Sequence, residues 1–113
     1  FLDFNGSVYE SFGSTLRKGP YTISASRLRS GPFLYSVKSI AGEHTITLDG
    51  TTVVGTTATN TVAWPSVCKY GVSYNGQTGG RELYELFVLP AAQATAPNIA
   101  TVAAYFKDLY GIA

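Results

Sequence analysis

The sequence predicts an α+β fold, in which an antiparallel meander of about six or seven strands is followed by one C-terminal amphipathic helix. Composition is the first indication, because thirteen Thr, twelve Gly and eight Tyr in 113 residues favour strands joined by many turns. Between residues 20 and 90, polar and apolar side chains alternate in short segments, which is the two-residue period of strands. From residue 97 the apolar residues recur at spacings of three and four, which is the period of a helix.

The chain is expected to form one domain over residues 1–113, since this length is short for two domains. Residues 1–12 predict a small N-terminal hairpin, because Asn5-Gly6 is a favoured two-residue turn between alternating segments. The antiparallel sheet is expected over residues 20–90 and the C-terminal helix over residues 95–111.

Two basic strands are predicted at residues 21–29 and 33–41, separated by the turn residues Gly31-Pro32. Residues 11–42 carry five Lys and Arg and no acid, although the net charge of the whole chain is only +1. Two such strands would place hydroxyls and cations on a sheet surface, which suits a polyanion such as a nucleic acid. The charge pattern alone fits an ordinary solvated sheet face equally well.

The middle of the chain predicts a hairpin. Residues 44–49 alternate throughout, and Asp49-Gly50 is a turn signal that returns the chain through residues 51–54. Residues 55–63 fit either a loop or an extension of the strand. Two further strands are expected, at residues 67–74 and 81–89.

The two ends of the C-terminal helix are marked in the sequence. Thr95 is the expected N-cap, Pro97 suits the first turn, and Gly111 suits the stop. One such helix cannot cover a wide sheet, so we expect it to pack across a dimer partner. Its apolar face would consist of Ile99, Val102, Ala103, Phe106, Leu109 and Tyr110.

No catalytic constellation is visible, and we expect that the protein is not an enzyme. His44 is the only histidine, and its phase with Ile46 and Leu48 fits a structural role better than a general base. Glu82 and Glu85 would point to opposite faces of a strand, which makes them a poor pair for glycoside hydrolysis. With one His and one Cys, we expect neither a metal site nor a cofactor.

Cys68 is the only cysteine, so an intrachain disulfide is impossible, and a buried structural thiol is favoured over a reactive or bridging one. No apolar run is long enough to span a bilayer, and we expect no membrane partner. The Gly-rich residues 75–80 lack the Lys-Ser/Thr of a phosphate loop, and no small-molecule substrate is expected.

Two stretches of the sequence resemble a known family. Residues 21–29 alternate Ser or Thr with other residues and are followed by Tyr35-Ser36-Val37-Lys38, and the last predicted strand ends at Pro90 before a Thr- and Ala-rich segment. In these features the chain resembles the coat proteins of single-stranded RNA bacteriophages (levivirus-like). The resemblance implies that two subunits join into one continuous sheet and that each lays its helix over the other. It also implies that the sheet faces the capsid interior and binds a hairpin in the genomic RNA.

The resemblance further implies a set of RNA-contacting residues. Lys38 would neutralise a phosphate, Tyr84 would stack on an unpaired base, and Arg29 joins the set if a bulge or the strand end turns it to the same face. By themselves, the serines of this set also fit a solvated sheet surface, and Tyr84 also fits core packing. The expected RNA-binding residues are Ser24, Ser26, Arg29, Ser36, Lys38 and Tyr84.

The expected function is that of a viral capsid structural protein that dimerises, self-assembles into an icosahedral shell and packages genomic single-stranded RNA. Its expected location is the virion, assembled in the cytoplasm of the bacterial host, with loops near residues 50–65 and 75–80 mediating contacts between dimers. A pilin or adhesin subunit is less favoured, because residues 1–12 are short and polar for a donor strand. The main alternative is a monomeric β-rich carbohydrate-binding module that stacks sugars on Trp64, Tyr70, Tyr74 and Tyr84.

Overall fold

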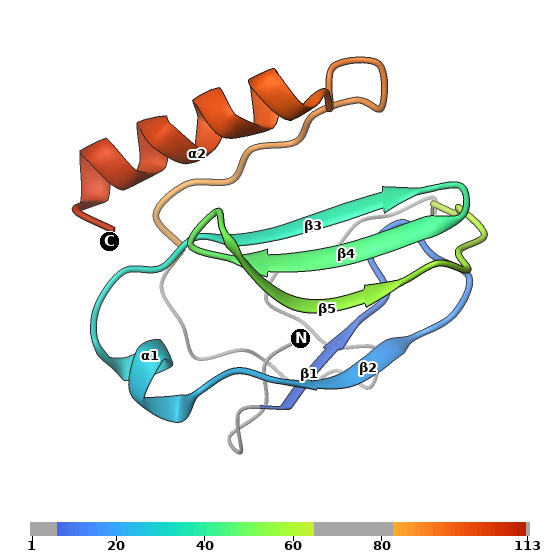
Figure 1. Cartoon of the computed structure of the whole chain (residues 1–113), viewed down its shortest axis with the longest axis horizontal. Coiled ribbons are helices and arrows are strands. Elements are labelled where there is room, and N and C mark those ends of the chain that lie inside the picture. Colours follow the sequence, from blue (N-terminus) through green and yellow to red (C-terminus); the bar gives the residue numbers. More distant parts are fainter. Residues whose placement is uncertain (1–6, 65–82, 113) are drawn as a thin grey trace.

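The computed structural model describes residues 7–64 and 83–112. These residues form two antiparallel sheets, one of two strands and one of three, and two helices (Figure 1). The α+β class and the C-terminal helix are confirmed, whereas the described residues contain five strands rather than six or seven. In chain order the elements are β1 (Ser7–Glu10), β2 (Lys18–Thr22), α1 (Ala25–Arg29), β3 (Tyr35–Ile40), β4 (Glu43–Leu48), β5 (Thr52–Thr57) and α2 (Ala96–Tyr110).

The three-stranded sheet has the order β3–β4–β5, with tight turns between consecutive strands. The hairpin predicted at Asp49-Gly50 is confirmed, and both residues have left-handed φ angles, of 55° and 76°, which suit the twist of a hairpin. In the two-stranded sheet β1 pairs with β2. The turn predicted at Asn5-Gly6 lies outside the described residues.

The core lies between the two sheets and α1. Alternate residues of β4 are buried, as the sequence pattern of residues 44–49 predicted. Burying an aliphatic side chain contributes about 1.5–3 kcal/mol, so a small cluster is enough to fix how the sheets pack. This cluster draws on both sheets and α1 and consists of Val8, Ile23, Leu28, Ile46 and Leu48.

The strand predicted over residues 21–29 is wrong, because β2 ends early in this stretch and α1 follows. Ile23 and Leu28 are both buried, at 3% and 6% exposure. In one continuous strand they would point to opposite faces, since they are five positions apart. A turn of helix brings both to the core, and Ser24 precedes it in the N-cap position, which serine favours.

The C-terminal helix has the predicted ends. α2 begins after Thr95 and carries Pro97 in its first turn, although the Thr95 side chain makes no capping hydrogen bond. Gly111 ends the helix with a left-handed φ of 63°, and its N–H donates to the carbonyl of Lys107. A non-glycine residue at this position would be strained.

Residues 83–112 form a C-terminal arm, in which residues 83–90 have no regular structure and run beside α2 (Figure 1). The strand predicted at residues 81–89 is therefore wrong over its described part. Within the described residues, α2 makes no close backbone contact with any strand or with α1. Side-chain contacts join the segment to the helix, among them the Phe87 and Phe106 rings at 6.1 Å, the Tyr84 and Tyr110 rings at 5.5 Å, and the Tyr105 hydroxyl donating to Glu85 at 3.2 Å.

Candidate nucleic-acid interface

One face of the three-stranded sheet is lined with hydroxyl groups. The register places Ser36 opposite Thr47 and Lys38 opposite Thr45, and Thr45 in turn lies opposite Thr56 on β5. Because side chains alternate across a strand, these residues lie on the face opposite to the buried residues of β4. We call this set the hydroxyl face: Ser36, Lys38, Thr45, Thr47 and Thr56.

The structure places Ser36 and Lys38 together, as the alternation of β3 predicted. Thr45 and Thr47 were not assigned to the site from the sequence, although the alternation of residues 44–49 puts both on one face. Thr56 was missed because a register shift between β4 and β5 decides which of its residues meet β4. Its hydroxyl lies 3.0 Å from that of Thr45.

A glutamate partly neutralises the lysine of the hydroxyl face. The Nζ of Lys38 lies 2.9 Å from Oε2 of Glu43, and the Thr45 hydroxyl donates to Oε1 at 3.1 Å. The hydrogen bond from Lys38 lowers the pKa of Glu43, with help from Thr45 and against a smaller opposing effect of burial. The side chains of Lys38 and Glu43 are 38% and 39% exposed, so their ion pair is weak. Lys38 can therefore leave Glu43 and bind another anion.

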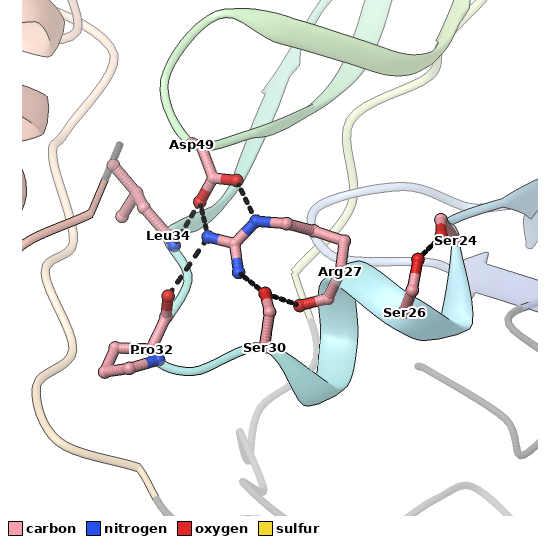
Figure 2. Close-up of polar contacts among 7 residues, drawn as sticks. All are labelled: Ser24, Ser26, Arg27, Ser30, Pro32, Leu34 and Asp49. Atoms are coloured by element: carbon pink, nitrogen blue, oxygen red, sulfur yellow. Dashed lines mark hydrogen bonds and ion pairs between the residues drawn. The ribbon is translucent and has the colours of Figure 1, made fainter.

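Three further candidates lie on or beside α1 and not on a strand. Ser24 precedes α1, Ser26 lies in its first turn, and their hydroxyl oxygens are 2.5 Å apart (Figure 2). Arg29 lies in the last turn and is exposed. The predicted placement of Ser24 and Ser26 on a strand face beside Ser36 and Lys38 is therefore wrong, and Arg29 lies on a helix and not at a bulge or strand end. The contact of these three residues with RNA stays a prediction.

Arg27 is held by Asp49. Figure 2 shows its guanidinium facing the carboxylate, with Nε 2.6 Å from Oδ2 and Nη2 2.7 Å from Oδ1. Arg27 also donates to the Ser30 hydroxyl and the Pro32 carbonyl, while Asp49 accepts the N–H of Leu34. This bidentate pair joins α1 to the turn between β4 and β5, so this cation has a structural role.

The other cations of the basic stretch are dispersed. The Arg17 guanidinium lies 4.4 Å from the centroid of the Tyr9 ring, and Lys18 donates to the Thr59 carbonyl at 2.9 Å. The positive charges therefore lie on the loop before β2, on β2, on α1 and on β3. The single basic surface of two adjacent strands, predicted from the sequence, is not formed.

Tyr84 lies on the C-terminal arm. Its side chain is 61% exposed, so the core-packing alternative is wrong. Its ring is tilted by 45° against that of Tyr110. An exposed tyrosine ring can stack on a base or a sugar, and the base-stacking role of Tyr84 stays a prediction.

The residues named for sugar binding are described only in part. The Trp64 ring meets Phe12 edge-on at 4.7 Å and is 53% exposed. Tyr70, Tyr74 and Cys68 lie outside the described residues.

Comparison with protein-family models, with curated proteins and with solved structures finds no match to this chain. In residues 7–64 and 83–112, no three His, Cys, Asp or Glu side chains gather as metal ligands would. Neither helix of this part of the chain is long and apolar enough to cross a membrane.

Proposed function

We propose that this chain is a viral capsid structural protein that dimerises, self-assembles into an icosahedral shell and packages genomic single-stranded RNA. The virion would be its location, after assembly in the cytoplasm of a bacterial host. The observation that carries the proposal is the apolar surface of the C-terminal arm. The hydroxyl face would contact the RNA, whereas pairing of the arms would bury Tyr84 and leave it unable to stack on a base.

The exposed apolar surface of the arm is large enough for a stable interface. Eight large side chains are between 37% and 64% exposed. At roughly 200 Å² for a whole side chain of this size, they leave roughly 800 Å² uncovered, the share of one partner in an interface of standard size. Such a patch on a soluble protein marks an interaction site. The eight are Leu83, Tyr84, Leu86, Phe87, Val88, Ile99, Tyr105 and Leu109.

A second copy of the chain is the partner that this surface favours. The arm carries only three charged side chains in its described part, Glu85, Lys107 and Asp108, and the core of an interface is likewise poor in charge. A two-fold axis brings the same patch of two subunits together, so each arm would cover the other subunit.

The chemistry of the hydroxyl face supports RNA packaging. Hydroxyl groups donate hydrogen bonds to phosphate and sugar oxygens, and Lys38 can exchange Glu43 for a phosphate. Because Glu43 stays close by and the net charge is +1, each subunit would neutralise few phosphates. We therefore expect modest affinity per subunit and a shallow dependence on salt.

Light scattering on a size-exclusion column, read together with the ultraviolet absorbance of nucleic acid, tests the proposal on the expressed chain. The expected result is a megadalton species that contains nucleic acid. A 12.0 kDa monomer free of nucleic acid would contradict both the assembly and the packaging.

Leu86→Lys tests whether the arm is the dimer interface, because the Leu86 side chain is 64% exposed and tolerates a charge in the monomer. We expect a folded protein that no longer dimerises, since an unpaired charge buried in an interface costs several kcal/mol. Leu16→Lys is the matched control, because Leu16 is 66% exposed and lies outside the arm. Equal dimer content in the two variants would argue against the arm as the dimer interface.

One observation favours the alternative of a monomeric carbohydrate-binding module. The arm presents Tyr84 and Tyr105 beside Glu85, and the Tyr105 hydroxyl donates to this carboxylate. Aromatic faces pack on sugar rings, and a carboxylate accepts their hydroxyl groups. A module of this kind would run as a monomer on size exclusion and would bind oligosaccharides. Assembly into a shell that buries the arm would exclude this alternative.

A further inference from the structure

His44 is a buried polar residue whose ring nitrogens make no well-formed hydrogen bond, although the backbone of Phe12 lies close to the ring. Its side chain is 0% exposed and shares a face of β4 with Ile46 and Leu48. Leaving a buried polar group unsatisfied costs about 1–3 kcal/mol, so such groups are uncommon. His44 is also the only histidine of the chain, and the proposed function makes no use of it.

His44 lies where the two sheets meet. Across the ladders of its own sheet it pairs with Ser39 on β3 and Thr57 on β5, neither of which carries a charge. The charged groups that act on it come from the other sheet, Glu10 on β1 and Lys18 on β2. His44 therefore faces the β1–β2 hairpin.

A positive charge on the imidazole would be poorly compensated here. Burial lowers the pKa of His44, and the positive charge of Lys18 lowers it further. A weak hydrogen bond with the backbone of Phe12 and the negative charge of Glu10 oppose this shift without reversing it.

Glu10 is not free to turn toward His44. One oxygen of its carboxylate accepts the N–H groups of Ser11 and Phe12, each at 2.9 Å, and the other accepts the Tyr35 hydroxyl at 3.1 Å. An imidazolium at His44 would therefore gain far more by reaching water than by staying buried.

Among the residues that the structure describes, a small number of contacts hold the loop of residues 11–17 onto β3 and onto residues 61–64. This loop joins β1 to β2, which are held independently of it by Val8 in the core and by Lys18 on the Thr59 carbonyl, so the loop can leave while the hairpin stays. The contacts are local and mostly single hydrogen bonds, each of which contributes about 0.5–1.5 kcal/mol. They are Ser39 Oγ donating to the Gly13 carbonyl at 2.6 Å, Thr15 N–H to Thr61 at 3.1 Å, Ala63 N–H to Gly13 at 3.3 Å, and the Phe12 and Trp64 rings at 4.7 Å.

We propose that protonation of His44 releases the loop of residues 11–17 from the three-stranded sheet, so that the protein opens locally in mild acid. The neutral imidazole packs as part of the core, whereas the imidazolium needs water that only the opened junction supplies. This device is a property of the subunit and stands whether or not the chain forms a shell.

The direction of the pH dependence follows from the two protonation equilibria. The opened chain binds a proton with the ordinary pKa of 6.5, and the closed protein binds it only at lower pH. Between these two values the opened state holds more protons, so stability falls as the pH falls through this window. The opening equilibrium constant rises by up to about tenfold for each pH unit within it.

Fluorescence of Trp64 reports the release directly, because Trp64 is the only tryptophan and packs against Phe12. We expect the wild-type signal to change in a one-proton transition that begins below pH 6.5. His44→Gln should lack this transition until the carboxylates titrate at lower pH. The same transition in both proteins would overturn the proposal.

A second measurement on the wild-type chain keeps the test decisive even if His44→Gln fails to fold. A single histidine gives a single set of imidazole resonances, which nuclear magnetic resonance follows without further assignment. The expected midpoint lies below pH 6.5 and coincides with the Trp64 transition. A midpoint at or above pH 6.5, or titration without a change in Trp64 fluorescence, overturns the proposal.

Discussion

Truncating Arg27 to alanine would leave the Asp49 carboxylate with the N–H of Leu34 and without both of its guanidinium hydrogen bonds. The side chains of the pair are 25% and 12% exposed, so the carboxylate is shielded from water without being fully buried. Breaking a buried pair costs about 3–5 kcal/mol and breaking a surface pair about 0–1 kcal/mol. Between these limits we expect Arg27→Ala to lower the free energy of unfolding by about 2–3 kcal/mol.

Asp49→Asn separates the charge of this pair from the shape of the turn. Asparagine tolerates the left-handed φ of 55° at this position, and the guanidinium keeps Ser30 and Pro32 as acceptors. We therefore expect a smaller loss than for Arg27→Ala, of about 1–2 kcal/mol. The loss of unfolding free energy in the double variant should be clearly less than the sum of the losses in the two single variants. The reason is that Asp49→Asn removes the negative charge that Arg27→Ala leaves unpaired.

Urea unfolding followed by Trp64 fluorescence measures these losses. Arg29→Ala is the matched control, because Arg29 lies on the same helix and is exposed, and we expect it to stay within about 0.5 kcal/mol of the wild type. If Arg27→Ala is no more destabilised than Arg29→Ala, or if the losses of the two single variants simply add, then the pair does not position α1.

Four further substitutions have defined outcomes. Glu43→Gln should raise the nucleic-acid content of purified particles, because it frees the positive charge of Lys38, and Lys38→Ala should lower it, because it removes that charge. Unchanged nucleic-acid absorbance in both variants would refute RNA binding by the hydroxyl face. Gly55→Ala should destabilise the subunit by about 1–3 kcal/mol in urea, because a Cβ there overlaps the Tyr21 ring, and an unchanged midpoint would refute this packing. Val62→Lys, at a side chain 38% exposed in the segment after β5, should preserve dimers and lower the yield of shells on size exclusion. An unchanged yield would argue against contacts between dimers through residues 50–65.

The elements that could be predicted from the sequence are those whose signals are local. Thr95, Pro97 and Gly111 mark the ends of α2 through backbone chemistry that does not depend on the rest of the fold. The turn at Asp49-Gly50 is local in the same way, and the alternation of β4 identifies its buried face.

The errors arose where distant contacts decide the structure. α1 has five residues, which is too short to show a helical period, and its place is fixed by Leu28 in the core and Arg27 on Asp49. Residues 83–90 are as apolar as a buried strand, yet a strand also needs a neighbour to bond its backbone, and none of the described residues provides one.

The candidate site was predictable only along a single strand. Alternation places Ser36 and Lys38 on one face without any knowledge of the neighbours. The ion pair of Lys38 with Glu43 forms because the turn between β3 and β4 brings Ile40 opposite Glu43. The sequence alone therefore did not show that the charge of Lys38 is partly neutralised.

Helix α2 makes no close backbone contact with the strands or α1 of the described part. The exposed C-terminal arm therefore makes the lifetime of a subunit depend on how abundant the protein is. An apolar segment without regular structure, such as residues 83–90, is a good substrate for proteases while the subunit is alone. Under the proposed pairing, a copy that meets another soon after synthesis would bury this segment, and a copy that does not would be degraded. Production of the protein would then have a threshold, below which subunits turn over and above which they accumulate.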